Sequence, residues 1–472
     1  MGLELITYSI SDIGKVITGK TPPASVKSAY SALDGVPFVT PKDMDGRRWI
    51  ENTERYLTSD GVAAVKRNLV PAMSVAVSCI GSDMGKAILL KKESVTNQQI
   101  NSIIIDVKRF NPKYIYYVLS TKQQYLKDVA GGSATPILNK TDFGKITFQA
   151  PSKYYQDLIV EYLDCLDSKR ELNRQVNQTL EQMAQALFKS WFVDFDPVVD
   201  NALDAGFFEQ DIAFPDELLR RAEARRAVRE HNDFKPLPDA IRQQFPAAFE
   251  ECAEPSLGLG GWVPKGWANI AIYSLAEFIN GAAYKAFEPN LEQRGLPIIK
   301  IAELKAGITA QTAFSDREMP DKYRLSTGDI LFSWSGNPDT SIDTFVWTYG
   351  DALLNQHIFK VTPPDDLGER SFVLIALKSL RQVFAETARN KQTTGLGHVT
   401  VADLKRLQIV KPEPNVLAAW DSLVSPYVNQ SLSLTLQAQT LSNLRDTLLP
   451  KLISGELRLD KIEADIAEEG AA

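Results

Sequence analysis

The chain has 472 residues, a formal net charge of −7 at pH 7 and 44% hydrophobic residues. This length and composition predict two to four globular domains with ordinary hydrophobic cores and argue against disorder over the whole chain. The sequence holds no apolar run long enough to span a membrane and no signal peptide at its start, so we expect a cytoplasmic protein without membrane contacts. The three cysteines and three histidines are scattered along the chain, which argues against a disulfide framework and predicts no metal site.

A set of short motifs occurs twice in the same order, with an offset of about 260 residues. The first copy holds Tyr8-Ser9, residues 35–39, residues 97–100 and Pro151, and the second holds Tyr273-Ser274, residues 295–299, residues 355–358 and Pro412. Such a period is too long for a solenoid. It predicts a duplicated domain, with two similar modules about a pseudo-twofold axis.

Each copy of the repeat has the pattern of a mixed α+β module. Short apolar runs predict strands at residues 74–78, 102–107, 329–332 and 357–361. Asn111 and Pro112 predict the start of a helix, because proline is favoured in a first helical turn. We expect one module over residues 1–150 and the other over residues 267–412.

A long stretch of helix pattern follows each module, at residues 157–191 and 417–453. Core positions recur every seven residues in both stretches. They are Ile159, Leu166, Asn173, Leu180 and Leu187 in the first helix, and Trp420, Tyr427, Leu434, Leu441 and Leu448 in the second. We assign the two helical regions to residues 151–196 and 413–458.

Two matched apolar stripes in a duplicated chain predict that the helices pack on each other, or on partner subunits. Two ordinary core helices are the alternative. The predicted fold class is therefore α+β, with two tandem mixed α/β modules separated by two long helices that pack as an antiparallel coiled coil. A buried Asn173 would help to fix the register of that pair.

The remaining segments are acidic. Residues 197–266 read as a linker with a charged helix near residues 215–230 and a short helix near residues 237–241, and residues 459–472 read as an acidic tail. By contrast, residues 1–150 hold 19 lysines and arginines against 13 aspartates and glutamates. The acidic pieces therefore lie outside the first module, while the second module is neutral.

Two motifs suggest nucleotide binding and methyl transfer, but the residues around them do not support either function. Residues 14–21 match the phosphate-binding loop GxxxxGK[ST], but Pro22 and Pro23 bar the helix that must begin there. Residues 111–114 resemble the Asn-Pro-Pro-Tyr motif of amino-methyltransferases, but Lys113 replaces the second proline and no glycine-rich cofactor loop accompanies it. We therefore predict no catalytic residues and no cofactor in this chain.

Polar and basic residues gather in predicted loops, and they are of the types that contact bases and phosphates. The candidate DNA contacts are Lys20, Thr21, Lys42, Arg47, Arg48, Asn97, Gln98 and Gln99 in the first module, and Lys300, Ser333, Trp334, Asn337, Asn355, Gln356, His357, Lys391, Gln392, Thr393 and Thr394 in the second. Such residues are also normal on any protein surface. In particular, Asn97 and Asn355 each precede a strand, where an Asn often serves as a turn residue.

From Tyr8 to about Leu457, the chain resembles the specificity subunit of type I restriction-modification enzymes. The resemblance rests on residues 13–22, on the Asn-Gln-Gln-Ile and Asn-Gln-His-Ile pair, and on the helix-end signatures at residues 180–197 and 444–456. These two signatures, in tandem, are the most specific part of it.

This resemblance implies a non-catalytic subunit with two target recognition domains, each reading one half of a bipartite site on double-stranded DNA. It also implies two methyltransferase subunits, which carry S-adenosylmethionine and dock on the helices, and restriction-translocase subunits that complete the enzyme. The alternative is a non-catalytic two-headed scaffold that binds proteins or glycans.

Overall fold

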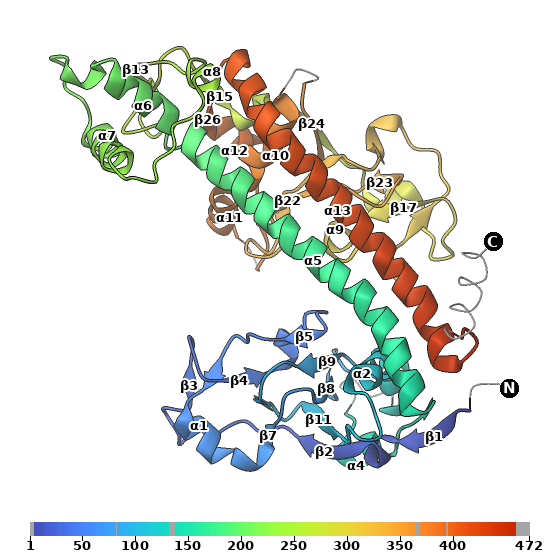
Figure 1. The fold of residues 1–472 in the computed structure, drawn as a ribbon. Coiled ribbons are helices and arrows are strands. Elements are labelled where there is room, and N and C mark those ends of the chain that lie inside the picture. Colours follow the sequence, from blue (N-terminus) through green and yellow to red (C-terminus); the bar gives the residue numbers. More distant parts are fainter. Residues whose placement is uncertain (1–3, 82, 132–136, 365–367, 393–394, 459–472) are drawn as a thin grey trace, which may run out of the picture. The chain divides into compact units, whose positions relative to one another are not determined.

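The computed structural model describes residues 4–81, 83–131, 137–364, 368–392 and 395–458 (Figure 1). The chain divides into two compact units, which we call unit 1 (Met1–Glu171 with Gln439–Ala472) and unit 2 (Leu172–Ala438). Each unit holds one mixed α/β module and a part of both long helices. The predicted fold class, with two tandem modules and two long helices, is thereby confirmed.

The module of unit 1 contains two five-stranded sheets and a short strand pair. The first sheet has the order β2 (Gly14–Thr18), β11 (Ile100–Ile105), β8 (Val75–Ser78), β9 (Ala87–Leu90), β5 (Trp49–Ile50). The second has the order β3 (Tyr30–Ser31), β6 (Tyr56–Leu57), β4 (Val36–Val39), β10 (Ser94–Thr96), β7 (Leu69–Val70). The strand pair is β1 (Ile6–Ser9) with β12 (Thr147–Ala150), and the helices are α1 (Ser59–Ala64), α2 (Pro112–Ser120), α3 (Gln123–Val129) and α4 (Lys140–Lys145).

The module of unit 2 has a similar arrangement, with four strands in each of its two sheets. Its sheets have the orders β16 (Glu277–Asn280), β24 (Ile358–Thr362), β20 (Ile330–Ser333), β22 (Asp343–Val346), and β18 (Phe314–Ser315), β17 (Leu296–Ile299), β23 (Ala352–Leu354), β19 (Arg324–Leu325). Two strand pairs complete it, β15 (Ala268–Ala271) with β26 (Gln408–Lys411) and β21 (Ser335–Gly336) with β25 (Gly397–His398). Its helices are α9 (Ile301–Ala306), α10 (Glu369–Ser379), α11 (Arg381–Arg389) and α12 (Val401–Arg406).

Equivalent strands of the two modules pair in the same register. Ile100 lies opposite Ser78 in unit 1 as Ile358 lies opposite Ser333 in unit 2. The parallel pairs β4–β10 and β17–β23 correspond in the same way. The residues of these paired strands therefore have defined counterparts in the other module.

Local sequence explains where the predicted elements begin and end. All four residues of β8 are buried, as expected for an uninterrupted apolar run in a core strand. Helix α2 starts at Pro112, and the Asn111 side chain accepts hydrogen bonds from the backbone N–H groups of Lys113 and Tyr114. Such capping satisfies donors that a helix start leaves unpaired.

The long helices are α5 (Lys153–Phe192) and α13 (Pro414–Ser454). Within unit 2, the Asn173 side-chain amide donates to the Leu434 carbonyl at 3.4 Å, and the rings of Phe188 and Trp420 lie 5.9 Å apart. Higher residue numbers on α5 thus meet lower numbers on α13, so the helices are antiparallel. Within unit 1, Arg445 of α13 forms an ion pair with Asp167 of α5 at 3.0 Å.

The residues predicted at the helix interface differ in exposure. Ile159, Asn173, Trp420 and Leu434 are buried. The remaining six are half-buried: Leu166, Leu180, Leu187, Tyr427, Leu441 and Leu448. The most buried α5 position in unit 1 is instead Leu163, which joins the core of the module. Each helix therefore packs both on its module and on the other helix. Its apolar face is for this reason wider than the single stripe that a seven-residue repeat predicts.

The segment after α5 folds into a small subdomain of unit 2 made of α6 (Asp196–Asp204), α7 (Asp216–Arg229), α8 (Asp239–Arg242), β13 (Phe249–Glu251) and β14 (Trp262–Pro264). Arginines of α7 form a ladder of ion pairs with aspartates of α6, such as Arg225 with Asp200 at 2.7 Å and Arg229 with Asp204 at 2.6 Å. Both helices expected in this region are present.

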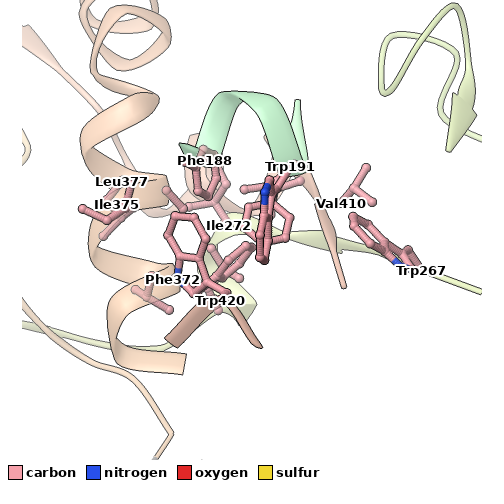
Figure 2. Close-up of a cluster of buried hydrophobic side chains, with 14 of the residues drawn as sticks. Phe188, Trp191, Trp267, Ile272, Phe372, Ile375, Leu377, Val410 and Trp420 are labelled. Carbon is pink, nitrogen blue, oxygen red and sulfur yellow. The ribbon is translucent and has the colours of Figure 1, made fainter. Parts of the chain in front are cut away.

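This subdomain shares the main core of unit 2. Trp191, at the end of α5, packs edge-on against Phe245 with ring centroids 4.9 Å apart. Figure 2 shows Trp191, Trp420 and Phe372 gathered with further aromatic and aliphatic side chains in this core. Aromatic side chains bury much apolar area in such edge-to-face pairs, so the subdomain is held by packing as well as by ion pairs.

In the described part of the chain, no helix combines the length and the apolar character needed to cross a membrane. Cys79 is buried, Cys252 is half-buried and Cys165 is exposed, and all three are free thiols. No three His, Cys, Asp or Glu side chains among the described residues gather into a group suited to a metal ion.

Candidate nucleic-acid interface

In unit 1, two predicted segments lie against each other. The Gly19 N–H donates to the Ile100 carbonyl at 2.9 Å, and the Lys20 N–H donates to the Thr96 carbonyl at 2.8 Å. The Thr21 hydroxyl donates to the Gln98 side-chain oxygen. The structure therefore brings Lys20 and Thr21 beside residues 97–99, and we call these two segments the first turn pair.

The first turn pair is unlike a phosphate-binding loop. Residues 14–18 form strand β2, and residues 19–29 contain no helix. A nucleotide loop requires a helix that begins at its Lys-Thr and points backbone N–H groups at the phosphates. The rejection of that motif on the grounds of Pro22 and Pro23 agrees with this geometry.

The backbone contact explains why glycine occupies position 19. A Cβ atom added there would overlap the carbonyl oxygens of Thr96 and Asn97. In unit 2, a Cβ at Gly281 would overlap the carbonyl oxygens of Leu354 and Asn355 in the same manner. Both modules thus need glycine for close approach of the two segments.

Asn97 is largely engaged within its own turn. Its side-chain oxygen accepts from the Gln99 N–H at 3.1 Å, and its amide nitrogen donates to the Gln99 side chain at 2.9 Å. Asn355 is also buried, with 2% exposure. This placement favours the turn interpretation for both asparagines. Lys20 and Gln98, by contrast, are exposed.

The basic cluster at residues 42–48 divides into surface and buried members. Lys42 is exposed, and Arg47 pairs with Asp45 at 2.8 Å on the surface. Arg48 has only 12% of its side chain exposed. Because Arg48 contacts Tyr117, Asp164 and Asp167, we do not propose it as a DNA contact.

Arg48 joins the module of unit 1 to α5. Its guanidinium donates to the Tyr117 hydroxyl at 2.7 Å and pairs with Asp164 and Asp167. Burial raises the pKa of Asp167, but the Tyr117 hydroxyl and the nearby Arg445 and Arg48 outweigh it and hold that pKa below its ordinary value. The Asp167 carboxylate therefore stays charged in its buried place.

Unit 2 has an equivalent second turn pair, residues 281–284 beside residues 355–357. The Ala282 N–H donates to the Leu354 carbonyl at 3.0 Å, and the Gln356 N–H donates to the Ala282 carbonyl at 2.9 Å. Of the predicted contacts, Asn355, Gln356 and His357 lie here. The Lys300 ammonium lies over the Tyr284 ring, 5.4 Å from its centroid.

Trp334 brings further groups to the second turn pair. Its ring centroid lies 5.7 Å from that of His357 and 5.8 Å from that of His398. Its indole N–H donates to the Asn280 side-chain oxygen at 3.1 Å. Neither Asn280 nor His398 was predicted as a site residue from the sequence. Both contact Trp334, but each is more than 50 residues from it along the chain, so no local pattern links them.

The other predicted residues of unit 2 have varied placements. Ser333 is fully buried in β20, so it faces the core. Asn337 is exposed, and its side-chain oxygen accepts from the backbone N–H groups of Asp339 and Thr340, as in a turn. Lys391 pairs with Asp403 at 2.5 Å, and Gln392 is exposed. Thr393 and Thr394 lie outside the described residues.

The two modules present different side chains at equivalent places. By strand register, Gln99 is the counterpart of His357. The Leu138 N–H donates to the Cys79 carbonyl in unit 1, and the Val399 N–H donates to the Trp334 carbonyl in unit 2. Because these two hydrogen bonds occupy the same place in the two modules, Cys79 is the counterpart of Trp334. The same frame thus carries a thiol and an amide in unit 1, at Cys79 and Gln99, and two rings in unit 2, at Trp334 and His357.

A family model described as type I restriction modification DNA specificity domain matches residues 4–182 and 264–415. The MjaIX type I restriction enzyme specificity subunit of Methanocaldococcus jannaschii is 24% identical over 96% of this chain and 93% of its own length. The HindI specificity subunit of Haemophilus influenzae is 24% identical over 95% of this chain and 99% of its own length. A solved type I restriction-modification S subunit from M. genitalium aligns over 95% of this chain and 96% of its own, with 14% identity and a TM-score of 0.49.

Proposed function

Because the chain belongs to the type I restriction-modification DNA specificity family, whose members are non-catalytic DNA-recognition subunits, we propose that its two modules read two different DNA sequences. Residues 1–150 form one target recognition domain, and residues 267–412 form the other. Each reads one half of a bipartite site in the major groove of double-stranded DNA. The two long helical regions fix the gap between the half-sites.

One observation supports this proposal most directly: the two modules share the same backbone arrangement at their turn pairs but have different side chains around them. Both modules close one turn pair through a glycine, at Gly19 and Gly281. Around that turn pair, unit 1 offers Lys20 and Gln98, while unit 2 offers Trp334 and His357. Base edges are distinguished by the donors and acceptors set against them, so equal frames with different groups favour different half-sites.

We further infer that two methyltransferase subunits, which hold S-adenosylmethionine, dock on the helices. Exposed apolar side chains support this: Tyr162 of α5 and Leu444 of α13 in unit 1, and Leu172 and Met183 of α5 in unit 2. Large apolar side chains in contact with solvent are typical of protein-binding surfaces when they gather on one element. Restriction-translocase subunits join the same complex, which acts on chromosomal DNA in the cytoplasm.

The test is to co-express the chain with its methyltransferase subunit and to map methylated adenines across the host genome. We expect a two-part motif with a fixed gap. Exchange of residues 267–412 for those of a relative should then change one half of the motif only. Methylation that ignores such an exchange would contradict the proposal.

The rival function is a two-headed scaffold that binds proteins or glycans. Salt separates the two functions, because DNA binding releases counterions and weakens steeply as the salt concentration rises. A fluorescence titration of the purified complex with a labelled duplex, at several salt concentrations, measures this slope. Binding that does not respond to salt favours the scaffold.

A further inference from the structure

A short basic helix lies beside the first turn pair in unit 1. The 3-10 helix η3 (Lys66–Asn68) has the sequence Lys-Arg-Asn, and the side chains of Lys66 and Arg67 are exposed. The Asn68 side-chain amide donates to the carbonyl of Thr18, the last residue of β2, at 2.8 Å. Lys20 of the first turn pair follows two residues later and is also exposed. The hydrogen bond from Asn68 therefore places η3 next to Lys20.

The charges of these three residues are not neutralised within the chain, and we call Lys20, Lys66 and Arg67 the basic patch. Among the described residues, no side-chain hydrogen bond or ion pair joins any of the three to a neighbour. Asp60, on the preceding helix α1, accepts instead from the Ser28 hydroxyl at 2.7 Å. The basic patch therefore keeps its positive charge for a ligand.

Strand register identifies the counterpart of η3 in unit 2. Leu69, directly after η3, pairs with Val95 of β10. Arg324 pairs in the same way with Leu353 of β23, the strand equivalent to β10. Arg324 directly follows the 3-10 helix η7 (Asp321–Tyr323). The helices η3 and η7 therefore occupy equivalent places in the two modules.

The two equivalent helices differ in charge. Asp321 of η7 stands where η3 has Lys66, and Lys322 stands where η3 has Arg67. Asp321 also forms an ion pair with Arg324 at 3.5 Å. An acidic and a basic group of η7 thus offset each other, whereas both charges of η3 are positive. This difference agrees with the excess of basic residues in the first module, which holds 19 lysines and arginines against 13 aspartates and glutamates.

We propose that the basic patch binds backbone phosphates of the DNA beside the half-site read by unit 1. Phosphates flank the base edges in a groove, and Lys and Arg side chains are their usual partners. Charged residues next to a turn pair that reads bases therefore meet the phosphates of the same groove. The inference rests on the proposed function, and it adds Lys66 and Arg67 as contacts to the DNA backbone that η7 does not repeat.

Contacts of this kind have two measurable properties. They carry no sequence information, so they strengthen binding to every DNA sequence alike. They also release counterions, and each phosphate that is neutralised contributes about 0.9 to the slope of log affinity against log salt concentration. Removal of two such contacts should therefore lower the salt dependence of binding without changing the recognised motif.

Lys66→Ala combined with Arg67→Ala tests the basic patch in the complex with the methyltransferase subunit. A fluorescence titration with a labelled duplex, at several salt concentrations, measures the slope. We expect the slope to fall by roughly 2, so that between about 50 and 200 mM salt the variant loses about tenfold less affinity than wild type. At low salt, a duplex of unrelated sequence should lose binding by the same factor as the target duplex. The methylated motif should stay unchanged.

Two controls separate charge from folding and from position. Lys66→Arg combined with Arg67→Lys keeps both charges and should keep the wild-type slope. Lys140→Ala removes an exposed lysine from α4, which lies against Ser11 before the start of β2, whereas η3 lies at the end of β2. This variant should also keep the wild-type slope.

The outcomes distinguish the patch from the proposed function. Wild-type DNA binding that does not respond to salt would overturn the proposed function itself. A wild-type slope in the double Ala variant, or a reduced slope in the charge-preserving variant, would overturn only the phosphate contact. A changed methylation motif would also overturn it, because that result indicates contact with a base. Weaker assembly with the methyltransferase subunit at an unchanged slope would show that the patch binds an acidic protein surface instead.

Discussion

At the scale of single residues, the two equivalent glycines are constrained by backbone rather than by side chains. Gly19→Ala should destabilise unit 1 by about 2 kcal/mol, since its Cβ meets two carbonyl oxygens that cannot rotate away. Gly144→Ala is the control, because its Cβ meets only the Ser11 side chain. Urea unfolding measures both. An equal effect of the two substitutions would show that close approach at Gly19 does not matter.

His357 gives a prediction for pH. Burial, followed by His398, holds its pKa below the ordinary value of 6.5. The unfolded chain therefore binds more protons than the folded chain just below pH 6.5, so stability should fall as the pH falls through this window. His357→Gln, which installs the residue found at the counterpart Gln99, should flatten the decline. Urea midpoints between pH 5 and pH 7.5 test this, and an unchanged decline in the variant contradicts it.

Arg48 shows that residue type alone does not identify a DNA contact. An arginine can bind DNA, but this one forms ion pairs with Asp164 and Asp167 inside unit 1. Arg48→Ala should cost about 2 kcal/mol, because it leaves the carboxylates of Asp164 and Asp167 with fewer partners in a partly buried site. Arg47→Ala should cost little, since its pair with Asp45 is on the surface. Urea unfolding of the two variants provides the comparison. If Arg48→Ala instead leaves stability intact and weakens DNA binding, Arg48 returns to the set of DNA contacts.

At the scale of elements, the long helices combine a buried face with exposed apolar positions. Leu434→Asp should destabilise unit 2 by about 3 kcal/mol, because Leu434 is 6% exposed and faces Asn173 of α5. Leu444→Asp should leave stability nearly unchanged, because this side chain is 44% exposed. On the proposed docking surface, it should weaken binding of the methyltransferase subunit. Calorimetric titration measures that binding, and undiminished affinity would remove Leu444 from the docking surface.

Asn173 and Leu434 have a further relation. They are equivalent positions of the repeat, 261 residues apart, and they contact each other. When two equivalent helices pack antiparallel, equivalent positions lie opposite each other only at the midpoint of the pair. The contact between Asn173 and Leu434 therefore marks that midpoint. The polar amide of Asn173, buried at that point, agrees with the predicted role in fixing the register.

At the scale of the whole molecule, the excess of positive charge lies in the first module. We predict that Lys20→Ala combined with Lys42→Ala reduces the salt dependence of DNA binding by roughly 2 in log–log slope, because each exposed lysine neutralises about one phosphate. Lys91→Ala is the control, since Lys91 pairs with Glu51. A double variant with an unchanged slope would place the bound DNA elsewhere.

Much of the architecture could be predicted because it is encoded locally. The strand runs appear as β8, β11, β20 and β24, and the two helix patterns appear as α5 and α13. Apolar periodicity and helix starts depend on neighbours within a few residues, so they survive without any knowledge of the fold. The duplication is also a property of the sequence alone.

Placement of side chains from distant parts of the chain could not be predicted in this way. Residues 197–266 read as an acidic linker, yet Phe245 packs on Trp191 and the aspartates of α6 pair with the arginines of α7. The charge composition of this segment does not predict its packed core, because a sequence does not show which charged residues form ion pairs and which are exposed to solvent.

The sequence by itself determined the repeat, the long helices, the elements of each module and the family resemblance. Only the tertiary structure decided which polar residues face solvent, that Arg48 anchors a helix, and that Trp334 meets both Asn280 and His398. The physical reason is that secondary structure follows from local periodicity, whereas a binding surface is made where strand ends far apart in the chain are brought together by packing of the core.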